Sequence, residues 1–351
     1  MENEHEPSGD GGVARMVTLN TIAEEARLSV STVSRVLNRV PNAASAATTA
    51  RVLSIAESLG YVPNAQAAAL RTGTSMAVGL IIADISNPFF AEIAVALEQR
   101  LLQRGIGLLV ANTGNNPDLE RQYVRLMAQN RVQALIVAPT SNEGEHLKEA
   151  QRFGIQVVLI DTPIEGLDVD SVLVDDEQAI EGAVAHLIGL GHERIGYISG
   201  HQRILSDVER LKGWSTALEK AGLEVDRELV VSGEFTELGG LRAASRLLAL
   251  PEPPTAIVAG NNFMAIGAIR SARARGVRIP DDLSLVSFDD MDWFDLADPM
   301  ITAIRQPVEE IGTLVSDLVL AGKKSSRGVN YVLKTSIIVR ESSAPPKARK
   351  A

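Results

Sequence analysis

Three short segments near the start of the chain carry apolar residues every three or four positions, as in a helix: LNTIAEEA (19–26), VSTVSRVL (30–37) and VLSIAESL (52–59). Thr18 and Ser29 stand where the N-caps of the first two helices are expected, and Gly60 stands where the third ends. The pattern therefore predicts two helices joined by a tight turn and a third that completes a small core. This is the helix-turn-helix layout.

The second segment has a strongly polar face. The stretch LSVSTVSRVLN (28–38) contains one arginine, four hydroxyl side chains, one amide and no acidic residue. Helical spacing places four of its polar side chains together: Ser31, Ser34, Arg35 and Asn38. In a helix-turn-helix such a face enters the major groove, where arginine reads guanine and hydroxyls contact phosphates. The pattern alone fits a plain three-helix cap with a solvated polar face equally well.

Further along the chain, uninterrupted apolar runs alternate with helical patterns. The runs predict strands at 78–83, 107–111, 134–138, 157–161, 194–199, 255–260 and 283–288. Continuously apolar strands are typical of a parallel sheet covered by helices on both faces. Seven or more such units predict an α/β fold of two doubly wound lobes, with the chain crossing between them.

A polar residue stands at the end of five of these strands: Asp84, Asn112, Asp161, Asn261 and Asp289. In open α/β sheets, ligands bind beyond the carboxyl ends of the strands. Carboxylates and amides suit sugars because hydroxyl groups both donate and accept hydrogen bonds. A helix N-cap explains any single position as well, above all Asn261 and Asn262. The set of five favours a site for a sugar-like ligand.

Composition narrows the class of protein. A chain of 351 residues predicts two or three domains. The absence of cysteine excludes a disulfide framework, a cysteine metal site and a cysteine nucleophile. No apolar run is long enough to span a membrane, and the N-terminal MENEHEPSGDGG lacks the apolar region of a secretory signal. These features predict a cytoplasmic protein without a membrane partner.

Charge is unevenly distributed along the chain. The net charge of −10 argues against indiscriminate nucleic-acid binding. Residues 1–14 carry four acidic side chains and no basic one, whereas residues 15–73 carry six arginines against three glutamates. The polar segment 28–38 therefore lies in a small basic region of an acidic chain.

The sequence lacks the common motifs of an enzyme. Neither GxGxxG after a strand nor GxxxxGK[ST] occurs, and G-x-S-x-G and H-E-x-x-H are also absent. The five histidines suit structural roles: His5, His146, His186, His192 and His201. We therefore expect no catalytic residue, no cofactor and no metal site. The alternatives are an α/β sugar-processing enzyme, a cytoplasmic sugar sensor without operator specificity, and a transport-type sugar receptor, which would need an export signal.

The segment VTLNTIAEEARLSVSTVSRVLN (17–38) closely resembles the DNA-binding headpiece of the lactose-repressor/galactose-repressor (LacI/GalR) family of bacterial transcription regulators. The resemblance implies that Val30, Ser31 and Arg35 read bases. It implies phosphate contacts for seven further residues: Thr18, Ser29, Thr32, Ser34, Asn38, Tyr61 and Asn64. The chain departs from the family at Arg27-Leu28, where Gly-Val is common. Its third helix also has few charges, for which Arg51 would partly compensate.

The next stretch, LGYVPNAQAAALRTG (59–73), resembles the hinge of the same family. Its alanines favour a helix, but so short a helix is marginal in water and should order only against a partner. The resemblance implies that two such helices from a dimer pair in the minor groove of double-stranded operator DNA. Leu70 would then wedge between base steps. A plain alanine-rich linker is the alternative.

The rest of the chain resembles the core of the family and the periplasmic sugar-binding proteins. The matching stretches are DISNPFFAEI (84–93), VERLKGW (208–214), AGNNFMAIGA (259–268) and SFDDMDWFDLADPMITAIRQP (287–307). The resemblance implies effector binding by Arg210, Asn261 and Asp289. It suggests aromatic residues for the walls of the site: one or other of Phe89 and Phe90, together with Phe235 and Trp293. Asn262 stands where the family usually has aspartate.

The resemblance also implies how the chain is divided. We expect an acidic disordered tail (1–15), a headpiece (16–60), a hinge (61–74), an effector-binding and dimerisation core (75–341) and a flexible tail (342–351). Lobe N would comprise residues 75–174 and 305–334, and lobe C residues 175–304 and 335–341. Crossings near 174, 304 and 335 would form a hinge around a cleft. The expected protein is a repressor gated by a sugar-like effector, either an inducer or a corepressor, and acts as a homodimer or as a tetramer.

Overall fold

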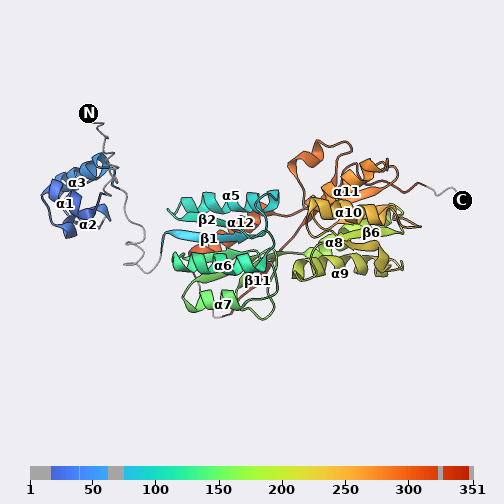
Figure 1. The fold of residues 1–351 in the computed structure, drawn as a ribbon, viewed down its shortest axis with the longest axis horizontal. Coiled ribbons are helices and arrows are strands. Elements are labelled where there is room, and N and C mark those ends of the chain that lie inside the picture. Colours follow the sequence, from blue (N-terminus) through green and yellow to red (C-terminus); the bar gives the residue numbers. More distant parts are fainter. Residues whose placement is uncertain (1–16, 39, 62–74, 323–326, 348–351) are drawn as a thin grey trace, which may run out of the picture. The chain divides into compact units, whose positions relative to one another are not determined.

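The computed structural model describes residues 17–38, 40–61, 75–322 and 327–347. The chain divides into two compact units after Arg71. The smaller unit contains the helical headpiece and the larger contains the α/β core (Figure 1). Within the described residues, no helix is long and apolar enough to cross a membrane.

The headpiece has three helices in residues 17–38 and 40–61: α1 (Leu19–Ala26), α2 (Val30–Leu37) and α3 (Ala46–Ser58). Ile22, Val33 and Val52 are fully buried between them. Thr18 and Ser29 cap α1 and α2 through their side chains, as predicted. The apolar stripe and the capping residues therefore account for the fold of this small unit.

In the turn between α1 and α2, Arg27 stands at a position whose backbone favours glycine. Arg27 is the C-cap of α1, with a left-handed backbone (φ 52°, ψ 47°). Glycine adopts this conformation without strain, whereas a side chain makes it costly. Arg51 of α3 donates from Nη2 to the Ala26 carbonyl oxygen at 2.8 Å. One guanidinium nitrogen of Arg51 thus binds the end of α1, while Arg51 is exposed and keeps further N–H donors, so its expected phosphate contact stays a prediction.

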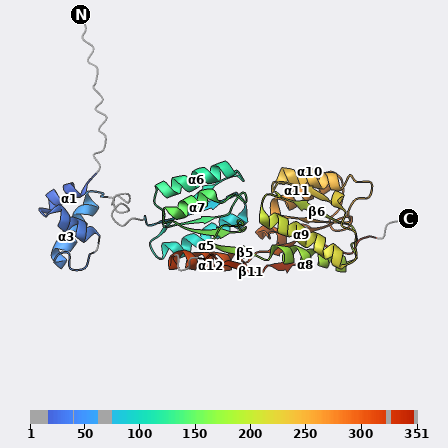
Figure 2. The same ribbon diagram turned by 90° about the horizontal axis from the view of Figure 1, so that it is seen from below.

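Within the described residues, lobe N is built on a six-stranded sheet with the order β11-β5-β4-β3-β1-β2. Every neighbouring pair is parallel. The strands are β1 (Ala77–Ile82), β2 (Gly107–Asn112), β3 (Ala134–Val137), β4 (Gln156–Ile160), β5 (Asp170–Val174) and β11 (Asn330–Leu333). Figures 1 and 2 show α5 (Pro88–Leu102) and α12 (Val308–Ala321) on one face, and α6 (Pro117–Gln129) and α7 (Glu145–Arg152) on the other.

Lobe C, as far as the structure describes it, repeats this plan with the order β12-β10-β9-β8-β6-β7. Its strands are β6 (Ile195–Ser199), β7 (Val230–Ser232), β8 (Ala256–Ala259), β9 (Ser284–Phe288), β10 (Thr302–Arg305) and β12 (Ser336–Ile338). Only the pair β10–β12 is antiparallel among these described strands. The covering helices are α8 (Asp176–Gly189), α9 (Leu205–Lys220), α10 (Glu237–Leu247) and α11 (Asn262–Ala274), with short 3₁₀ turns at Arg227–Leu229 and Asp292–Asp295.

The buried faces of β1 show why the strands read as continuous apolar runs. Leu80 and Ile82 belong to the core that includes the buried residues of α5 and α12, whereas Ile81 belongs to the core beneath α6 and α7. Successive side chains point to opposite faces of a strand, so covering both faces requires apolar residues throughout. The predicted α/β fold with two doubly wound lobes is confirmed.

Three connections join the lobes in the part of the chain that the structure describes. They run from β5 to α8, from β10 to α12 and from β11 to β12. The seven strands expected from the sequence did not include β5, β7, β10, β11 and β12. Two of these, β7 and β12, have only three residues each, too few to produce a clear periodic pattern.

The prediction of a flexible tail from residue 342 is wrong for residues 342–347. The Ser342 hydroxyl donates to the Leu285 carbonyl oxygen at 2.6 Å and accepts from the Thr302 amide at 2.8 Å. Ala344 adds a backbone N–H donated to Ser284 Oγ at 3.0 Å. This segment satisfies backbone groups beside β9 and β10, so its polar composition reflects hydrogen bonding rather than disorder.

Candidate DNA-binding face and effector cleft

The face of α2 predicted to read DNA is exposed. Val30, Ser31 and Arg35 are all exposed on the headpiece. Within the described residues, the guanidinium of Arg35 has neither an ion pair nor a hydrogen bond. The start of α2 therefore offers two short side chains beside one arginine that is not held by a partner in this unit.

The predicted phosphate contacts include residues that already organise the helix ends. Ser29 Oγ accepts from the Thr32 amide at 3.1 Å and lies 2.8 Å from Thr32 Oγ1. Thr18 Oγ1 accepts from the Thr21 amide, and Asn38 Nδ2 donates to the Ser34 carbonyl oxygen at 2.6 Å. Hydroxyl groups keep a further capacity to donate or accept, so capping is compatible with a phosphate contact.

The remaining predicted DNA contacts lie at the end of the headpiece and beyond it. Tyr61 is half-buried and packs against the headpiece core. Asn64 and Leu70, together with the predicted hinge helix in residues 62–74, lie outside the described residues.

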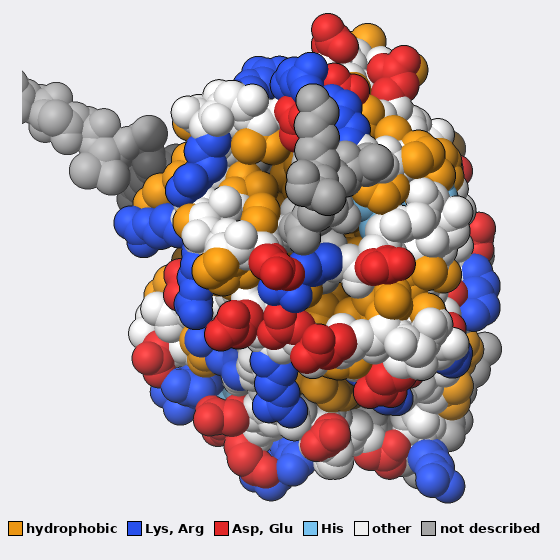
Figure 3. All heavy atoms as spheres, turned by 90° about the vertical axis from the view of Figure 1, so that its right-hand side faces the viewer, with side chains coloured by type: hydrophobic (Ala, Val, Ile, Leu, Met, Phe, Trp, Pro, Cys, Tyr) orange, Lys and Arg blue, Asp and Glu red, His pale blue; other side chains and the backbone are white. Residues whose placement is uncertain are grey.

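The face of lobe C in Figure 3 mixes acidic and basic side chains. It offers no single-sign basic surface of the kind that binds a phosphate backbone.

A cavity lies between lobe N and lobe C, at the carboxyl ends of strands in both sheets. Eight of the nine predicted effector residues line it: Asp84, Phe89, Phe90, Asp161, Arg210, Phe235, Asn261 and Asp289. Its free space is about 50 Å³. Small-molecule pockets typically enclose roughly 300–1,000 Å³. The two lobes are therefore closed upon one another, and a ligand of sugar size requires them to separate or the lining side chains to move.

Arg210 organises the floor of this cavity. Its Nε donates to Asp176 Oδ1 at 2.5 Å and its Nη1 donates to the Gly260 carbonyl oxygen at 2.9 Å. Its remaining Nη2 lies 3.8 Å from Asp161 Oδ1, too far for a hydrogen bond. Arg210 is buried, so this nitrogen is a donor held ready for a ligand oxygen near Asp161.

Three carboxyl groups around Arg210 are perturbed by burial. Burial raises the pKa of Asp161 to about 6 and that of Asp176 to about 7, while the Arg210 cation opposes both changes. Burial also raises the pKa of Asp289, again against Arg210. A hydrogen bond donated to a carboxylate favours its ionised form. Ligand hydroxyls that donate to these oxygens would therefore stabilise the charged state that burial penalises.

Gln306 is a residue of the site that the sequence reasoning missed. It follows β10, lines the cavity, and donates from Nε2 to Asp289 Oδ1 at 2.6 Å. Among the described residues, its Oε1 is buried without a donor. A buried unpaired oxygen at the wall of a cavity is suited to accept a ligand hydroxyl. The rule that indicated Asp84 and Asp289, a polar residue after a strand, would have indicated Gln306 had β10 been recognised.

Three of the four aromatic residues considered for the walls of the site line the cavity. Phe89 and Phe90 line it from lobe N, with ring centroids 5.0 Å apart, and Phe235 lines it from lobe C. A Cβ atom at Gly200 would lie 2.0 Å from Phe235 Cζ, so Gly200 is needed to seat this ring. Trp293 does not line the closed cavity and is 38% exposed. The 3₁₀ turn buries Phe294 instead.

Asn112 is also absent from the cavity wall. Its Oδ1 accepts from the Ile85 amide at 3.0 Å and so stabilises the loop after β1. Asn261 occupies a position compatible with both capping and ligand contact. It lines the cavity and caps α11 by accepting from the Met264 amide at 2.9 Å. A polar residue at a strand end can thus serve the loop, the ligand or both.

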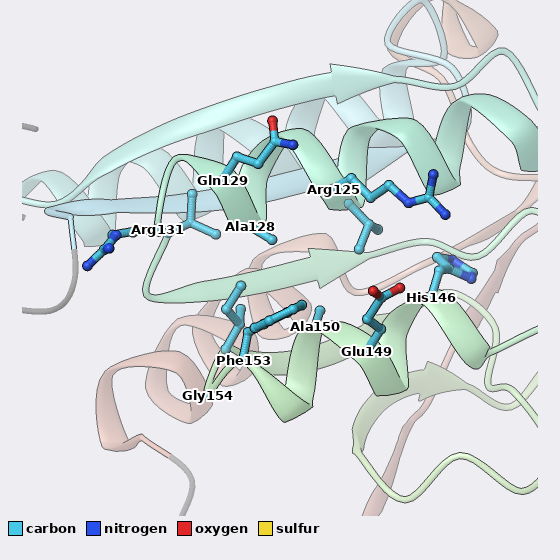
Figure 4. Close-up of a pocket in the computed structure, with 12 residues that line it drawn as sticks. Arg125, Ala128, Gln129, Arg131, His146, Glu149, Ala150, Phe153 and Gly154 are labelled. Carbon is cyan, nitrogen blue, oxygen red and sulfur yellow. The ribbon is translucent and has the colours of Figure 1, made fainter.

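A second hollow, a groove of about 620 Å³, lies between α6 and α7 of lobe N (Figure 4). Val124, Ala128 and Ala150 contribute apolar parts of its lining, and Phe153, which also lines it, is 72% exposed. Arg125 and Glu149 extend from facing helices (Figure 4). The groove belongs to one lobe and lies away from the strand ends. Its polar lining comes from five side chains: Arg125, Gln129, Arg131, His146 and Glu149.

The fold and the site together define a two-lobed ligand-binding core preceded by a helix-turn-helix headpiece. Residues 18–64 match the model of bacterial regulatory proteins of the lacI family. Residues 75–333 match the model of periplasmic binding proteins and the sugar binding domain of the LacI family. The chain therefore belongs to the LacI family of bacterial regulatory proteins.

Individual relatives agree with this assignment. The transcriptional regulator DegA of Bacillus subtilis is 32% identical over 336 residues, covering 93% of this chain and 98% of that protein. A structure of the regulator CelR with cellobiose has a TM-score of 0.70 at 29% identity and covers 93% of this chain and 100% of its own. The structure of the lac repressor dimer bound to operator and an anti-inducer has a TM-score of 0.82 at 25% identity. The match covers 94% of this chain and 100% of that chain.

Proposed function

We propose that the protein is a cytoplasmic transcriptional repressor that binds a palindromic operator in double-stranded DNA as a homodimer. A small sugar-like effector, held between lobe N and lobe C, controls this binding. The observation that carries the proposal is that one chain combines the exposed polar face of α2 with the closed polar cavity around Arg210. Its relatives are regulators rather than enzymes, and we assign it no catalytic activity.

The headpiece supports the DNA-binding part of the proposal. Val30 and Ser31 at the start of α2, with Arg35 one turn later, would contact base edges in the major groove. Thr18, Ser29, Thr32, Ser34 and Asn38 would contact phosphates, joined by Tyr61 and Asn64 at the end of the headpiece. A structural relative, the lac repressor, was solved as a dimer on its operator. One headpiece touches few base pairs, so a dimer on a palindrome supplies the specificity that a monomer lacks.

Exposed apolar residues of lobe N support dimerisation. Val95 and Leu102 on α5, and Leu109 and Val110 on the edge strand β2, are all exposed. α5 and β2 are in contact, so these side chains belong to neighbouring elements of one lobe. Apolar side chains on an uncovered edge strand favour association. We therefore place part of the dimer interface on α5 and β2.

The cavity supports a polyhydroxylated effector. Asp161 and Asp289 offer acceptors, Arg210 offers a donor, and Gln306 offers an unpaired buried oxygen. Phe235 from lobe C and Phe89 from lobe N provide apolar walls for the carbon skeleton of a ring. A structural relative, CelR, was solved with cellobiose. This donor and acceptor set suits a sugar or sugar acid.

The test begins with the purified full chain and a pool of random duplex oligonucleotides. We expect selection to enrich a palindromic sequence, bound by two protomers per duplex in a titration followed by fluorescence anisotropy. A thermal-shift screen of sugars and sugar acids should then yield a ligand that changes this affinity. Equal affinity for every duplex would contradict operator recognition. A ligand that stabilises the protein but leaves operator affinity unchanged would contradict effector control.

A further inference from the structure

The two lobes meet at a contact between two buried amides, Asn87 and Asn262. Asn262 Nδ2 donates to Asn87 Oδ1 at 2.9 Å. Asn87 belongs to lobe N, where it is the N-cap of α5, and is 6% exposed. Asn262 belongs to lobe C, where it is the first residue of α11, and is fully buried. The hydrogen bond therefore spans the closed cleft directly beside the effector cavity.

The orientation of each amide is fixed by its own helix. Asn87 Oδ1 also accepts from the Phe89 amide at 3.1 Å, which is its capping bond. Asn262 Oδ1 accepts from the Phe263 amide at 2.7 Å. Both oxygens therefore face backbone N–H groups. The NH₂ group of Asn262 is left to donate across the cleft, and Asn87 can receive it without giving up its cap.

An aspartate at position 262 would reverse this contact. One carboxylate oxygen could still accept from the Phe263 amide, but the other would face Asn87 Oδ1, so two acceptors would meet. Turning the Asn87 amide to present its NH₂ group would remove the cap from Phe89. A buried charge without a donor, or a lost cap, would penalise the closed arrangement in either case.

We propose that the Asn87–Asn262 amide pair is an interlobe latch that biases this protein toward the closed state before any effector binds. The inference rests on the proposed function, in which the relative position of the lobes is what the effector controls. A latch that favours closure raises the fraction of protein in the closed state, so it weakens binding of any ligand that requires the lobes to separate, and it tightens binding of one that fits the closed cavity. Asn262 is thus a positioning residue that sets the resting state of the regulator.

Other hydrogen bonds cross the same cleft, and a backbone amide in one of them can report whether the cleft is open or closed. Arg203 of lobe C donates to the carbonyl oxygens of Asn115 and Thr140 at 3.0 and 3.2 Å. The Ser206 amide donates to Thr162 Oγ1 of lobe N at 3.1 Å. Ser206 lies in the first turn of α9, whose N–H groups have no partner within the helix, and the N-cap Ile204 gives no side-chain bond. Opening of the cleft therefore exposes this amide to exchange.

The experiment follows hydrogen exchange in the full chain by mass spectrometry, with no ligand and no DNA. We expect Asn262→Asp to raise the exchange rate of the Ser206 amide on the order of tenfold, the effect of losing one buried hydrogen bond. Asn87→Ser retains an N-cap hydroxyl but shortens the acceptor, and should give a similar rise. The double variant should add little to either change, because both substitutions break one contact.

Asn130→Asp is the matched control. The side-chain amide of Asn130 also donates a hydrogen bond, from Nδ2 to the Leu126 carbonyl oxygen at 2.8 Å, but at the exposed end of α6. It should leave exchange at Ser206 unchanged. An unchanged rate in Asn262→Asp, an additive double variant, or a rise spread through β8 and β9 would overturn the latch. Because neither operator nor effector is used, this result is separate from success or failure of the operator-binding test.

Discussion

The guanidinium carbon of Arg210 lies 3.6 Å from the centre of the Phe288 ring. The ring supports one face of the guanidinium, while Asp176 and the Gly260 carbonyl oxygen hold two of its nitrogens. A stacked arginine with several fixed hydrogen bonds has little freedom to move. The cavity is thus built around a cation whose position is settled before a ligand arrives.

Arg210→Lys should therefore be severe despite preserving the charge. Lysine cannot make the planar set of hydrogen bonds or stack in the same way, and Asp176 would be left poorly paired in a buried site. We expect a loss of about 3 kcal/mol in the free energy of unfolding of the core, measured by urea denaturation. The thermal shift caused by a sugar that stabilises the parent should also disappear. Lys212→Arg, two positions along at an exposed site, should change neither quantity; a variant of Arg210 as stable as the parent would contradict this role.

Arg35→Ala should weaken operator binding by about 1–3 kcal/mol and relax the base preference at one position of each half-site. Arg35 is exposed on the headpiece, so its removal should not disturb the core of Ile22 and Val33. The measurement is fluorescence anisotropy against the operator and its single-base variants. Arg125→Ala, an exposed arginine of lobe N, serves as the control. An unchanged base preference in Arg35→Ala would exclude direct readout by this side chain.

Arg27→Gly should stabilise the headpiece, because residue 27 has a left-handed backbone. Relief of that strain should stabilise the folded headpiece by about 1 kcal/mol. This gain exceeds the free energy lost because glycine gives the unfolded chain more conformational entropy. Hydrogen exchange of the α1 and α3 amides in the full chain should slow about fivefold. Arg100→Gly, in the last turn of α5, has an ordinary helical backbone and should instead destabilise its helix. Faster exchange in Arg27→Gly would show that the arginine side chain contributes more than the strain costs.

Asp161→Asn should flatten the dependence of core stability on pH. The pKa of Asp161 is raised from 3.8 to about 6 in the folded protein, so the folded state holds its proton more tightly than the unfolded chain. This contribution to stability is complete below about pH 4 and is lost as the pH rises through 6. Urea denaturation between pH 4 and 7.5 should show a smaller decline in Asp161→Asn than in the parent. Asp168→Asn, which changes an exposed carboxylate of lobe N outside the interlobe cavity, should keep the parental slope.

The sequence predicted the strand-end residues well because the rule behind them is geometric. Asp84, Asp161 and Asp289 each end a buried run, and parallel strands bring such ends to one edge of a sheet. The same rule failed for Asn112, whose side chain serves its own loop. Gln306 was missed because β10 is short and was not recognised as a strand.

Side-chain direction and internal competition account for the other differences. Trp293 and Phe294 are adjacent aromatics in a 3₁₀ turn, and sequence gives no basis for deciding which of them is buried. Arg51 was expected near phosphate, and nothing in the sequence indicated that one of its nitrogens also binds the Ala26 carbonyl oxygen. Ser342 begins a polar stretch typical of a mobile tail, yet it pairs with the backbone of β9 and β10. In each case a tertiary partner, invisible in the local pattern, decides the outcome.

The central claim is that one ligand in the interlobe cavity controls one DNA site through a single shared equilibrium. It is tested most directly by isothermal titration of the stabilising sugar into the full chain, alone and saturated with its selected operator. Linkage requires that operator change sugar affinity by the same factor by which sugar changes operator affinity, typically 5- to 150-fold. We predict equal factors in the two directions. Identical sugar affinity with and without operator would contradict the account.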